Sequence, residues 1–140
     1  MVSVEHDVRW FEQVKSTLKA NQEIYLQTEK ESYVKTLPAQ GQTFQVIVID
    51  GKWRYACAQI APASLSPGGL IIFDNSEWYP NSTALLRQQG FYQVDFSGFG
   101  PINNYCWTTS IFFTSLGQDR DTYRDPCPIG GLRQLAEDDQ

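Results

Sequence analysis

The spacing of hydrophobic positions changes several times along the chain, and each change predicts a new element. Residues 2–5 form a short β-prone run, and from residue 8 to residue 18 apolar side chains recur at helical spacing. Asp7 stands directly before this helix, where an N-cap belongs, and Asn21 is expected to end it. Residues 23–27 alternate like a half-buried strand. The N-terminal part therefore predicts a strand, a capped helix and a second strand.

A polar stretch separates this part from the most apolar strands of the sequence. Residues 28–42 predict a connecting loop with room for one helical turn. Residues 44–50 then form a nearly continuous apolar run that closes on Asp-Gly, a pattern typical of a strand buried on both faces. Residues 53–65 favour a helix, although Pro62 restricts its register.

The remaining pattern predicts two further strands around a short helix. The Ser-Pro-Gly-Gly sequence at 66–69 is expected to turn the chain into a second buried strand over 70–74. A capped helix running to residue 89 ends at Gly90, and strands follow at about 91–96 and 107–114. The connection between these last two strands is too short for a crossover helix, so the final pair should be antiparallel.

Strands that alternate with helices indicate an α/β fold with a mostly parallel sheet covered by helices on both faces. We expect residues 1–116 to form this α/β domain. Residues 117–140 contain too few apolar side chains for another layer. They are expected to be a poorly ordered C-terminal tail.

Composition excludes several classes of partner. The chain has 140 residues, of which 41% are hydrophobic and 19% charged, and a net charge of −5 without any cluster of Lys and Arg. Such a chain is a poor partner for nucleic acid, because it cannot neutralise a row of phosphates. Its longest strongly apolar run, residues 69–73, is far shorter than the ~20 residues that cross a bilayer. We expect no membrane association and a cytoplasmic location.

The cysteines and the histidine limit the chemistry further. Cys57, Cys106 and Cys127 are odd in number and show no Cys-x-x-Cys spacing, so we interpret them as reduced thiols. Cys57 lies in an apolar helical stretch, where a small core side chain is favoured over a nucleophile. His6 is the only histidine, which excludes a site with several histidine ligands.

Acidic residues stand at three predicted strand ends. Glu5, Asp50 and Asp74 each close an apolar run. In open α/β sheets, ligands bind outside the carboxyl ends of the strands, because loops and helix N-termini meet there. These three residues are therefore the first candidates for a functional site.

Three segments together carry a family resemblance. They are Val-Ser-Val-Glu-His-Asp at 2–7, Val-Ile-Val-Ile-Asp-Gly at 46–51 and Ser-Pro-Gly-Gly-Leu-Ile-Ile-Phe-Asp-Asn at 66–75. In this order, and with the strand at 108–113, they resemble successive motifs of the class I S-adenosylmethionine-dependent methyltransferases. The resemblance implies a Rossmann-like methyltransferase sheet, mostly parallel with an antiparallel last strand, and S-adenosylmethionine as the cofactor.

The resemblance assigns a cofactor role to the first strand end. In that family the acid at the position of Glu5 accepts hydrogen bonds from the cofactor's ribose hydroxyls, and the two oxygens of a carboxylate suit a diol. A solvated acid at a strand end is the alternative. The neighbouring His6 is expected to line the adenosine site or to face solvent.

The other two strand ends resemble a metal site. Asp50, Asp74 and Asn75 are similar to the oxygen ligands of the catechol O-methyltransferase type, in which a divalent cation holds the acceptor hydroxyl. Carboxylates and an amide oxygen suit Mg²⁺, and Asp50 would then act in catalysis as well as in metal binding. The alternative is purely structural, because Asp-Gly and Asp-Asn pairs also form turns and helix caps.

Neighbouring residues offer further contacts with a substrate. Lys52 and Arg54 follow the strand-end acid and could reach a phosphate or a carboxylate, but a solvated face is the favoured interpretation. Trp78, Tyr79 and residues 99–105 fall where acceptor-binding loops occur in the family. Aromatic rings there could stack on a planar acceptor, or pack over the end of the sheet.

The sequence also departs from the family. Its glycine-rich turn after a first strand is missing here, and the glycines at 68, 69, 98 and 100 fall elsewhere. The chain thus resembles an N-terminally truncated methyltransferase whose absent strand would lie centrally, which would expose two strand edges or bring them together.

Two functional hypotheses follow from these observations. The first is a methyltransferase that acts on the oxygen of a small-molecule acceptor. The second is a non-catalytic interaction or oligomerisation module, with homo-oligomers formed through the exposed strand edges. A Rossmann dehydrogenase is disfavoured by the antiparallel final pair and by the missing glycine-rich turn.

Overall fold

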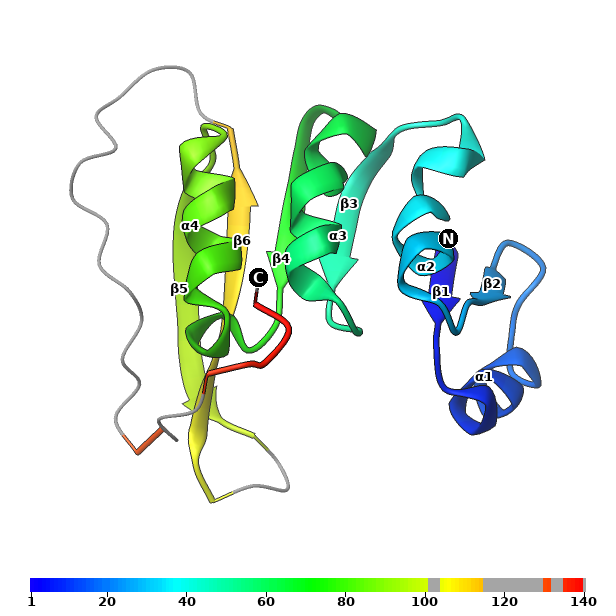
Figure 1. Cartoon of the computed structure of the whole chain (residues 1–140), viewed down its shortest axis with the longest axis horizontal. Coiled ribbons are helices and arrows are strands. Elements are labelled where there is room, and N and C mark those ends of the chain that lie inside the picture. Colours follow the sequence, from blue (N-terminus) through cyan, green and yellow to red (C-terminus); the bar gives the residue numbers. More distant parts are fainter. Residues whose placement is uncertain (101–103, 115–129, 132–134, 140) are drawn as a thin grey trace.

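Short apolar runs form strands, and capped or proline-led segments form the helices between them (Figure 1). The computed structural model describes residues 1–100, 104–114, 130–131 and 135–139. Its strands are β1 (Val2–Glu5), β2 (Glu23–Leu26), β3 (Phe44–Ile49), β4 (Leu65–Phe73), β5 (Tyr92–Phe99) and β6 (Cys106–Phe113). Its α-helices are α1 (Val8–Lys15), α2 (Lys30–Lys35), α3 (Arg54–Ile60) and α4 (Pro80–Gln88). Shorter 3₁₀ turns are η1 (Pro38–Gln40), η2 (Ala61–Ser64) and η3 (Ser76–Trp78).

The strands form two separate sheets. Strands β1 and β2 pair in parallel, and the larger sheet has the order β3-β4-β6-β5. Strand β3 is parallel to β4, whereas β6 is antiparallel to both of its neighbours. The predicted α/β class, mostly parallel with an antiparallel last strand, is therefore confirmed.

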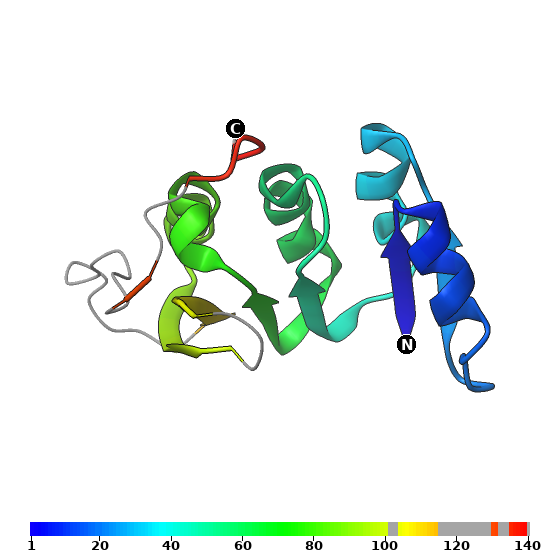
Figure 2. The same cartoon turned by 90° about the horizontal axis from the view of Figure 1, so that it is seen from below.

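A slot separates the two sheets. Within the described part of the chain, β1 pairs with β2 alone and β3 pairs with β4 alone. The arrows of β1, β3 and β4 nevertheless point the same way (Figure 2). The two sheets thus form one row of aligned strands with an interruption between β1 and β3.

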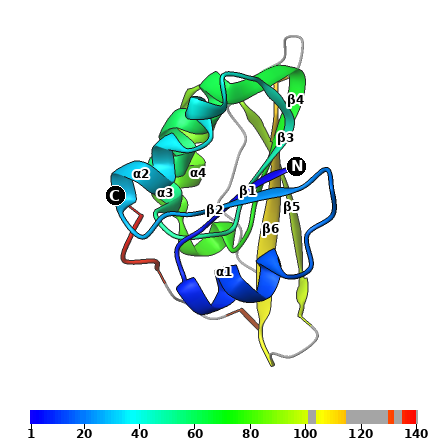
Figure 3. The ribbon, with the colours of Figure 1, turned by 90° about the vertical axis from the view of Figure 1, so that its right-hand side faces the viewer.

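The larger sheet carries its helices on one face. Helices α3 and α4 pack side by side over it, and Figure 3 shows α2 on the same side. The opposite face has no helix cover in the described residues, and its apolar side chains are exposed: Val46 by 49%, Val48 by 61%, Val94 by 43% and Phe96 by 58%. The expectation of helices on both faces is wrong for this sheet.

The core lies between the larger sheet and α3 and α4. Phe73 of β4 is completely buried, and its ring meets the edges of Tyr79 at 5.6 Å and Phe112 at 6.5 Å between centroids. The other buried apolar side chains of this cluster are Ile47, Ile49, Ala58, Ala61, Ile71, Leu86 and Phe91. Burial of side chains of this size supplies the main favourable contribution to folding.

Local chemistry explains where the first helix begins and ends. Asp7 caps α1 as predicted, its Oδ1 accepting a hydrogen bond from the Trp10 amide at 2.8 Å. The helix ends at Lys15, before the predicted Asn21. The hydroxyls of Ser16 and Thr17 donate to the backbone carbonyls three residues earlier, and such bonds compete with continued helix.

Two connections differ from the predicted turns. The polar segment predicted as a loop contains α2 and η1, so it is more helical than expected. The Ser-Pro-Gly-Gly sequence lies inside β4, where the pairing with β3 shifts register between Phe44 and Val46. Gly68 has a φ of +75° there, a conformation that favours glycine.

The last described residues pack against α4. Asp139 is only 5% exposed, and its side chain accepts hydrogen bonds from the Asn81 amide at 2.7 Å and the Ser82 amide at 2.8 Å. The Ala136 amide donates to the Trp78 carbonyl at 2.7 Å. Asp139 thus caps α4 from the far end of the sequence, within the region predicted as a tail. The rest of that tail, 117–129, 132–134 and 140, lies outside the described residues.

Two other predictions bear on the fold. Cys57 and Cys106 are free thiols, and Cys127 lies outside the described residues. None of the helices in the described residues has the length and apolarity needed to cross a membrane. The cytoplasmic location stays a prediction.

Replacing the distant cap should destabilise the fold. We expect Asp139→Ala to lower the free energy of unfolding by about 1–3 kcal/mol, because buried amide and hydroxyl donors of α4 lose their acceptor. Urea denaturation measures the change, and Glu137→Ala at a nearby exposed position is the matched control. An equal and negligible effect of both substitutions would contradict the capping role.

Candidate functional site

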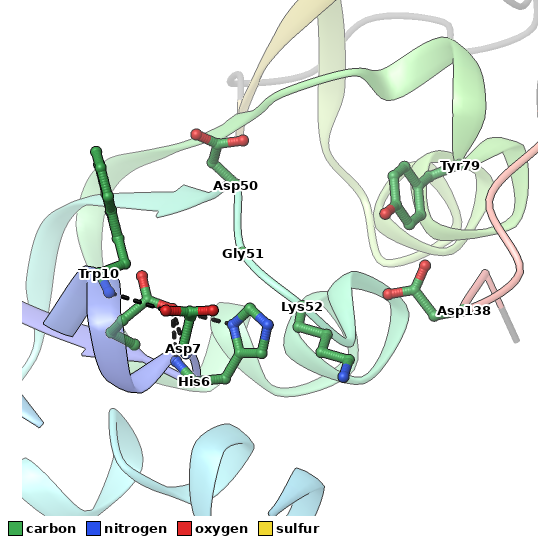
Figure 4. A pocket seen from close by; sticks show the side chains of 9 residues that line it. His6, Asp7, Trp10, Asp50, Gly51, Lys52, Tyr79 and Asp138 are labelled. Carbon is green, nitrogen blue, oxygen red and sulfur yellow. Dashed lines mark hydrogen bonds and ion pairs between the residues drawn. The ribbon is translucent and has the colours of Figure 1, made fainter. Parts of the chain in front are cut away.

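The carboxyl ends of β1 and β3 meet at an open cleft of about 360 Å³ (Figure 4). Its lining comprises Glu5, His6, Asp7, Trp10, Asp50, Gly51, Lys52, Tyr79 and Asp138. The structure thus brings together three of the predicted site residues, Glu5, His6 and Asp50. Asp74 and Asn75 follow β4 and do not line this cleft.

Glu5 is held by the turn that follows it. Its Oε1 accepts hydrogen bonds from the backbone amides of His6 at 2.7 Å and Asp7 at 2.8 Å. The side chain is 19% exposed, and its Oε2 has no hydrogen-bond partner in the described residues. One oxygen therefore fixes the carboxylate while the other stays available to a hydroxyl donor.

Aromatic rings flank this carboxylate. His6 lies with Nδ1 3.0 Å from Glu5 Oε1, and its ring meets the edge of Trp53 with 6.1 Å between centroids. Trp10, at the start of α1, is 58% exposed and lines the same cleft. A flat heterocycle beside Glu5 would have apolar ring surface on the protein side.

Arg54 is the central charged group of the strand ends. It is the first residue of α3 and is only 8% exposed. Its guanidinium donates to the carbonyl oxygens of Asp50, Gly51 and Asp74. It also contacts the Asp50 carboxylate at 3.1 Å and lies 4.9 Å from the centre of the Tyr79 ring. The favoured interpretation of Arg54 as part of a solvated face is therefore wrong.

The guanidinium also contacts two of the three residues predicted to bind a metal, Asp50 and Asn75. Arg54 Nη2 contacts Asp50 Oδ1 at 3.1 Å, and Nη1 donates to Asn75 Oδ1 at 3.3 Å. Asp74 Oδ1 accepts a hydrogen bond from the Thr109 hydroxyl. One oxygen of each of these three side chains is thus already held by Arg54 or Thr109. The metal role of the three residues stays a prediction. The described residues also contain no cluster of three or more His, Cys, Asp or Glu side chains suited to a metal.

Asp50 has an altered acidity. The protein atoms around it reduce its hydration and raise the pKa of its carboxyl above the usual range, and Asp74 raises it further, while Arg54 opposes the shift. Its side chain is still 59% exposed, so it remains accessible from the cleft. A carboxylate of raised pKa is a better proton acceptor than an ordinary aspartate.

One wall of the cleft comes from a segment that the sequence pattern did not indicate. Asp138 lines it from the C-terminal segment, and its Oδ2 accepts a hydrogen bond from the Trp53 amide at 2.9 Å. Tyr79 is 7% exposed, and burial raises the pKa of its hydroxyl to about 12, so the phenol stays protonated at neutral pH. Tyr79 was expected near an acceptor loop, whereas no local pattern pointed to Asp138.

Comparison with known proteins identifies the fold. None of the known protein-family models matches the sequence, and none of the curated proteins matches it either. Solved structures are similar: the methyltransferase from Pyrococcus furiosus shares 17% identity with a TM-score of 0.59 over 82% of this chain and 62% of that one. The O-methyltransferase TomG from Streptomyces achromogenes, solved with SAM, shares 13% with a TM-score of 0.58 over 81% and 61%.

A third structure gives the same result. The precorrin-6y C5,15-methyltransferase from Geobacter metallireducens shares 10% identity with a TM-score of 0.58 over 81% of this chain and 66% of that one. At such identities the likeness shows the fold alone, which is a Rossmann-like methyltransferase fold. The chain spans less than two thirds of the length of each of these proteins. Residues 44–140 make up 97 of the 140 residues, which is less than 82% of the chain. A match over 82% of the chain must therefore also include part of residues 1–43.

Removing the buried guanidinium should destabilise the strand ends. We expect Arg54→Met to lower the free energy of unfolding by about 3–5 kcal/mol, since the buried carbonyls lose their donors. Arg54→Lys should restore only part of this loss, because a point charge cannot match a planar fork of donors. Urea unfolding measures both, with Lys52→Met as the exposed control. A loss from Lys52→Met as large as that from Arg54→Met would refute this role.

Added Mg²⁺ should not stabilise the protein. Since Arg54 or Thr109 already holds the Oδ1 atom of Asp50, Asp74 and Asn75, we expect an excess of MgCl₂ to shift the melting temperature no more than CaCl₂ or matched NaCl does. Differential scanning fluorimetry measures the shifts. A saturable shift specific to Mg²⁺ would contradict this expectation and support the predicted metal site.

Proposed function

We propose that this cleft binds the adenosine part of S-adenosylmethionine and that the protein acts in methyl transfer to the oxygen of a small-molecule acceptor. The proposal rests on Glu5 at the carboxyl end of β1. One oxygen of its carboxylate is fixed by two backbone amides, and the other has no partner among the described residues. The proposal is further supported by the fold, which the chain shares with several methyltransferases, one of them an O-methyltransferase solved with SAM.

The residues present fit one end of the cofactor. Glu5 Oε2 would accept a ribose hydroxyl, and His6 and Trp10 would border the adenine ring. Four carboxylates and one lysine line the cleft, so its charge favours a cationic ligand. The described residues offer no glycine-rich cradle for the methionine end, which would need a further segment.

S-adenosylmethionine, when bound, supplies an electrophilic methyl group on a positively charged sulfur. The part that the chain itself plays is to position the acceptor and to take a proton. Asp50 is accessible in the cleft and has a raised pKa, so it is the residue that would accept the proton of the acceptor hydroxyl. Arg54 would hold Asp50 in place through its backbone carbonyl and one carboxylate oxygen.

A second function has a specific observation in its favour. In the part of the chain that the structure describes, β1 and β3 each have one edge without a strand partner, which suits a non-catalytic module that associates with another polypeptide. Such a module would need neither Glu5 Oε2 nor Asp50. Cofactor binding therefore separates the two functions.

The cofactor role of Glu5 can be tested directly. We expect the chain to bind S-adenosylhomocysteine, and Glu5→Gln to weaken the binding about 10- to 100-fold, because a charged acceptor for a hydroxyl is lost. Isothermal titration calorimetry gives the affinities, and Glu12→Gln on the exposed face of α1 is the matched control. If folded wild-type protein binds no ligand, or if both variants bind equally, the proposed site is wrong.

A further inference from the structure

The residue directly before α3 has an unusual backbone conformation. Trp53 adopts a φ of +53° and a ψ of +42°, which is the left-handed conformation. Bulky residues rarely adopt it, because their Cβ comes too close to the following carbonyl oxygen. The residue before a helix is commonly extended and accepts a hydrogen bond with its side chain, whereas Trp53 makes no such bond. The local sequence therefore does not account for this turn.

Contacts from distant parts of the chain hold Trp53 in this conformation. Its amide donates to Asp138 Oδ2 at 2.9 Å, although the two residues are 85 positions apart. Its carbonyl accepts from the Cys57 amide at 3.0 Å, a bond of the first turn of α3. Its ring meets the edges of His6 at 6.1 Å and Tyr33 at 5.3 Å between centroids. A strained residue persists where its surroundings determine its conformation in this way.

The turn determines where the neighbouring loop lies. Residues 50–52 connect β3 to Trp53, and all three line the cleft. With Trp53 in the left-handed conformation, the side chain of Arg54 lies back against this loop. Its Nε donates to the Gly51 carbonyl at 2.9 Å, and its Nη2 donates to the Asp50 carbonyl at 3.0 Å. The position of the loop in the cleft therefore depends on the turn at Trp53.

Trp53 also connects the two walls of the cleft. Its ring packs against His6 on the wall that carries Glu5. Its amide reaches Asp138, which lies on the opposite side of the cleft from Trp10 (Figure 4). In the described residues the two sheets share no strand pair, so side chains must connect the walls. Trp53 makes such a connection with its ring and its amide.

Asp138 does not act as an ordinary helix cap. A capping carboxylate accepts from the amides of the second or third helical residue, as Asp139 does with Asn81 and Ser82 of α4. Asp138 accepts instead from Trp53, which precedes the first residue of α3. Its hydrogen bond therefore acts on the strained residue itself.

We propose that Asp138 is a positioning residue, which keeps Trp53 in the left-handed conformation and thereby holds the loop of residues 50–52 in the cleft. Without Asp138, Trp53 relaxes to a more favourable conformation, and Arg54 and the loop shift with it. The effect on ligand binding rests on the proposed function, because the ligand of this cleft is the proposed cofactor. The effect on the free protein does not.

Hydrogen exchange in the free protein tests the proposal. We expect Asp138→Ala to speed the exchange of the Trp53 amide and of the Arg54 Nε–H group at least about tenfold, since a hydrogen bond to a charged acceptor is lost. Asp138→Asn should restore most of the protection, because an amide oxygen can still accept this bond. NMR follows both groups, and Glu137→Ala at the exposed neighbouring position is the matched control.

An internal control separates a local effect from a loss of the whole C-terminal segment. The Ser82 amide is held by Asp139, the next residue of that segment. Its exchange should stay unchanged in Asp138→Ala, because the proposal concerns only the turn before α3.

A second substitution separates positioning from packing. Glycine adopts the left-handed conformation without strain, so a Trp53→Gly variant does not need Asp138 to hold the turn. In this background, Asp138→Ala should speed the exchange of Arg54 Nε–H at least about threefold less than in the wild type. If Trp53→Gly does not fold, Trp53→Asn serves instead, because asparagine also tolerates this conformation.

Ligand binding tests the consequence for the cleft. We expect Asp138→Ala to weaken the binding of S-adenosylhomocysteine about tenfold, and Glu137→Ala to bind like the wild type. Isothermal titration calorimetry measures the affinities. If the folded wild-type protein binds no ligand, the proposed function is wrong, and the exchange results still decide the role of Asp138.

Any of four results would overturn the proposal. The first is unchanged exchange of Arg54 Nε–H in Asp138→Ala, and the second is an equal effect of Asp138→Ala with tryptophan and with glycine at position 53. The third is an equal gain in exchange at Ser82, which would mean that Asp138 only anchors the C-terminal segment. The fourth is a wild-type protein that binds S-adenosylhomocysteine no more tightly than Asp138→Ala does.

Discussion

A single buried guanidinium determines the arrangement of the strand ends on which the site depends. Parallel strands end with carbonyl groups that have no partner in the sheet, and here Asp50, Gly51 and Asp74 direct such carbonyls at Arg54. Because the planar fork of donors reaches all of them at once, the ends of β3 and β4 stay together and α3 starts at a fixed place. The Tyr79 ring packs against the same group, so the wall of the cleft is set by it as well.

The three strand-end acids show that the same residue type serves different purposes at one edge of the fold. Glu5 is fixed by the amides of its own turn, Asp74 is held by the Thr109 hydroxyl, and Asp50 shares the guanidinium but stays accessible. Of the three, only Glu5 and Asp50 line the cleft. The difference arises from the groups that surround each strand end.

Runs of apolar residues allowed the strands to be predicted, because β3, β4 and β6 are buried on at least one face and need such side chains. Asp7 was predictable as a cap since its partner, the Trp10 amide, is three residues away. The role of Arg54 was not predictable, because its acceptors are mostly backbone carbonyls. Backbone carbonyls are present at every residue, so the pattern of side chains does not indicate them. The capping role of Asp139 was not predictable either, because the helix that it caps begins 59 residues earlier in the chain. A long-range contact of this kind, from the Trp53 amide to Asp138, also brings Asp138 to the cleft.

Both ends of the described chain lie beside hollows of the structure. Met1 lines the slot, and its ammonium group donates to the Asn21 carbonyl at 2.8 Å. Asp138 and Asp139, near the other end, line the cleft and cap α4. An affinity tag fused directly to the N-terminus would therefore sit at the mouth of the slot, and one fused to the C-terminus would pull on the cap. For binding measurements, a cleavable tag that leaves no extra residues is the appropriate choice.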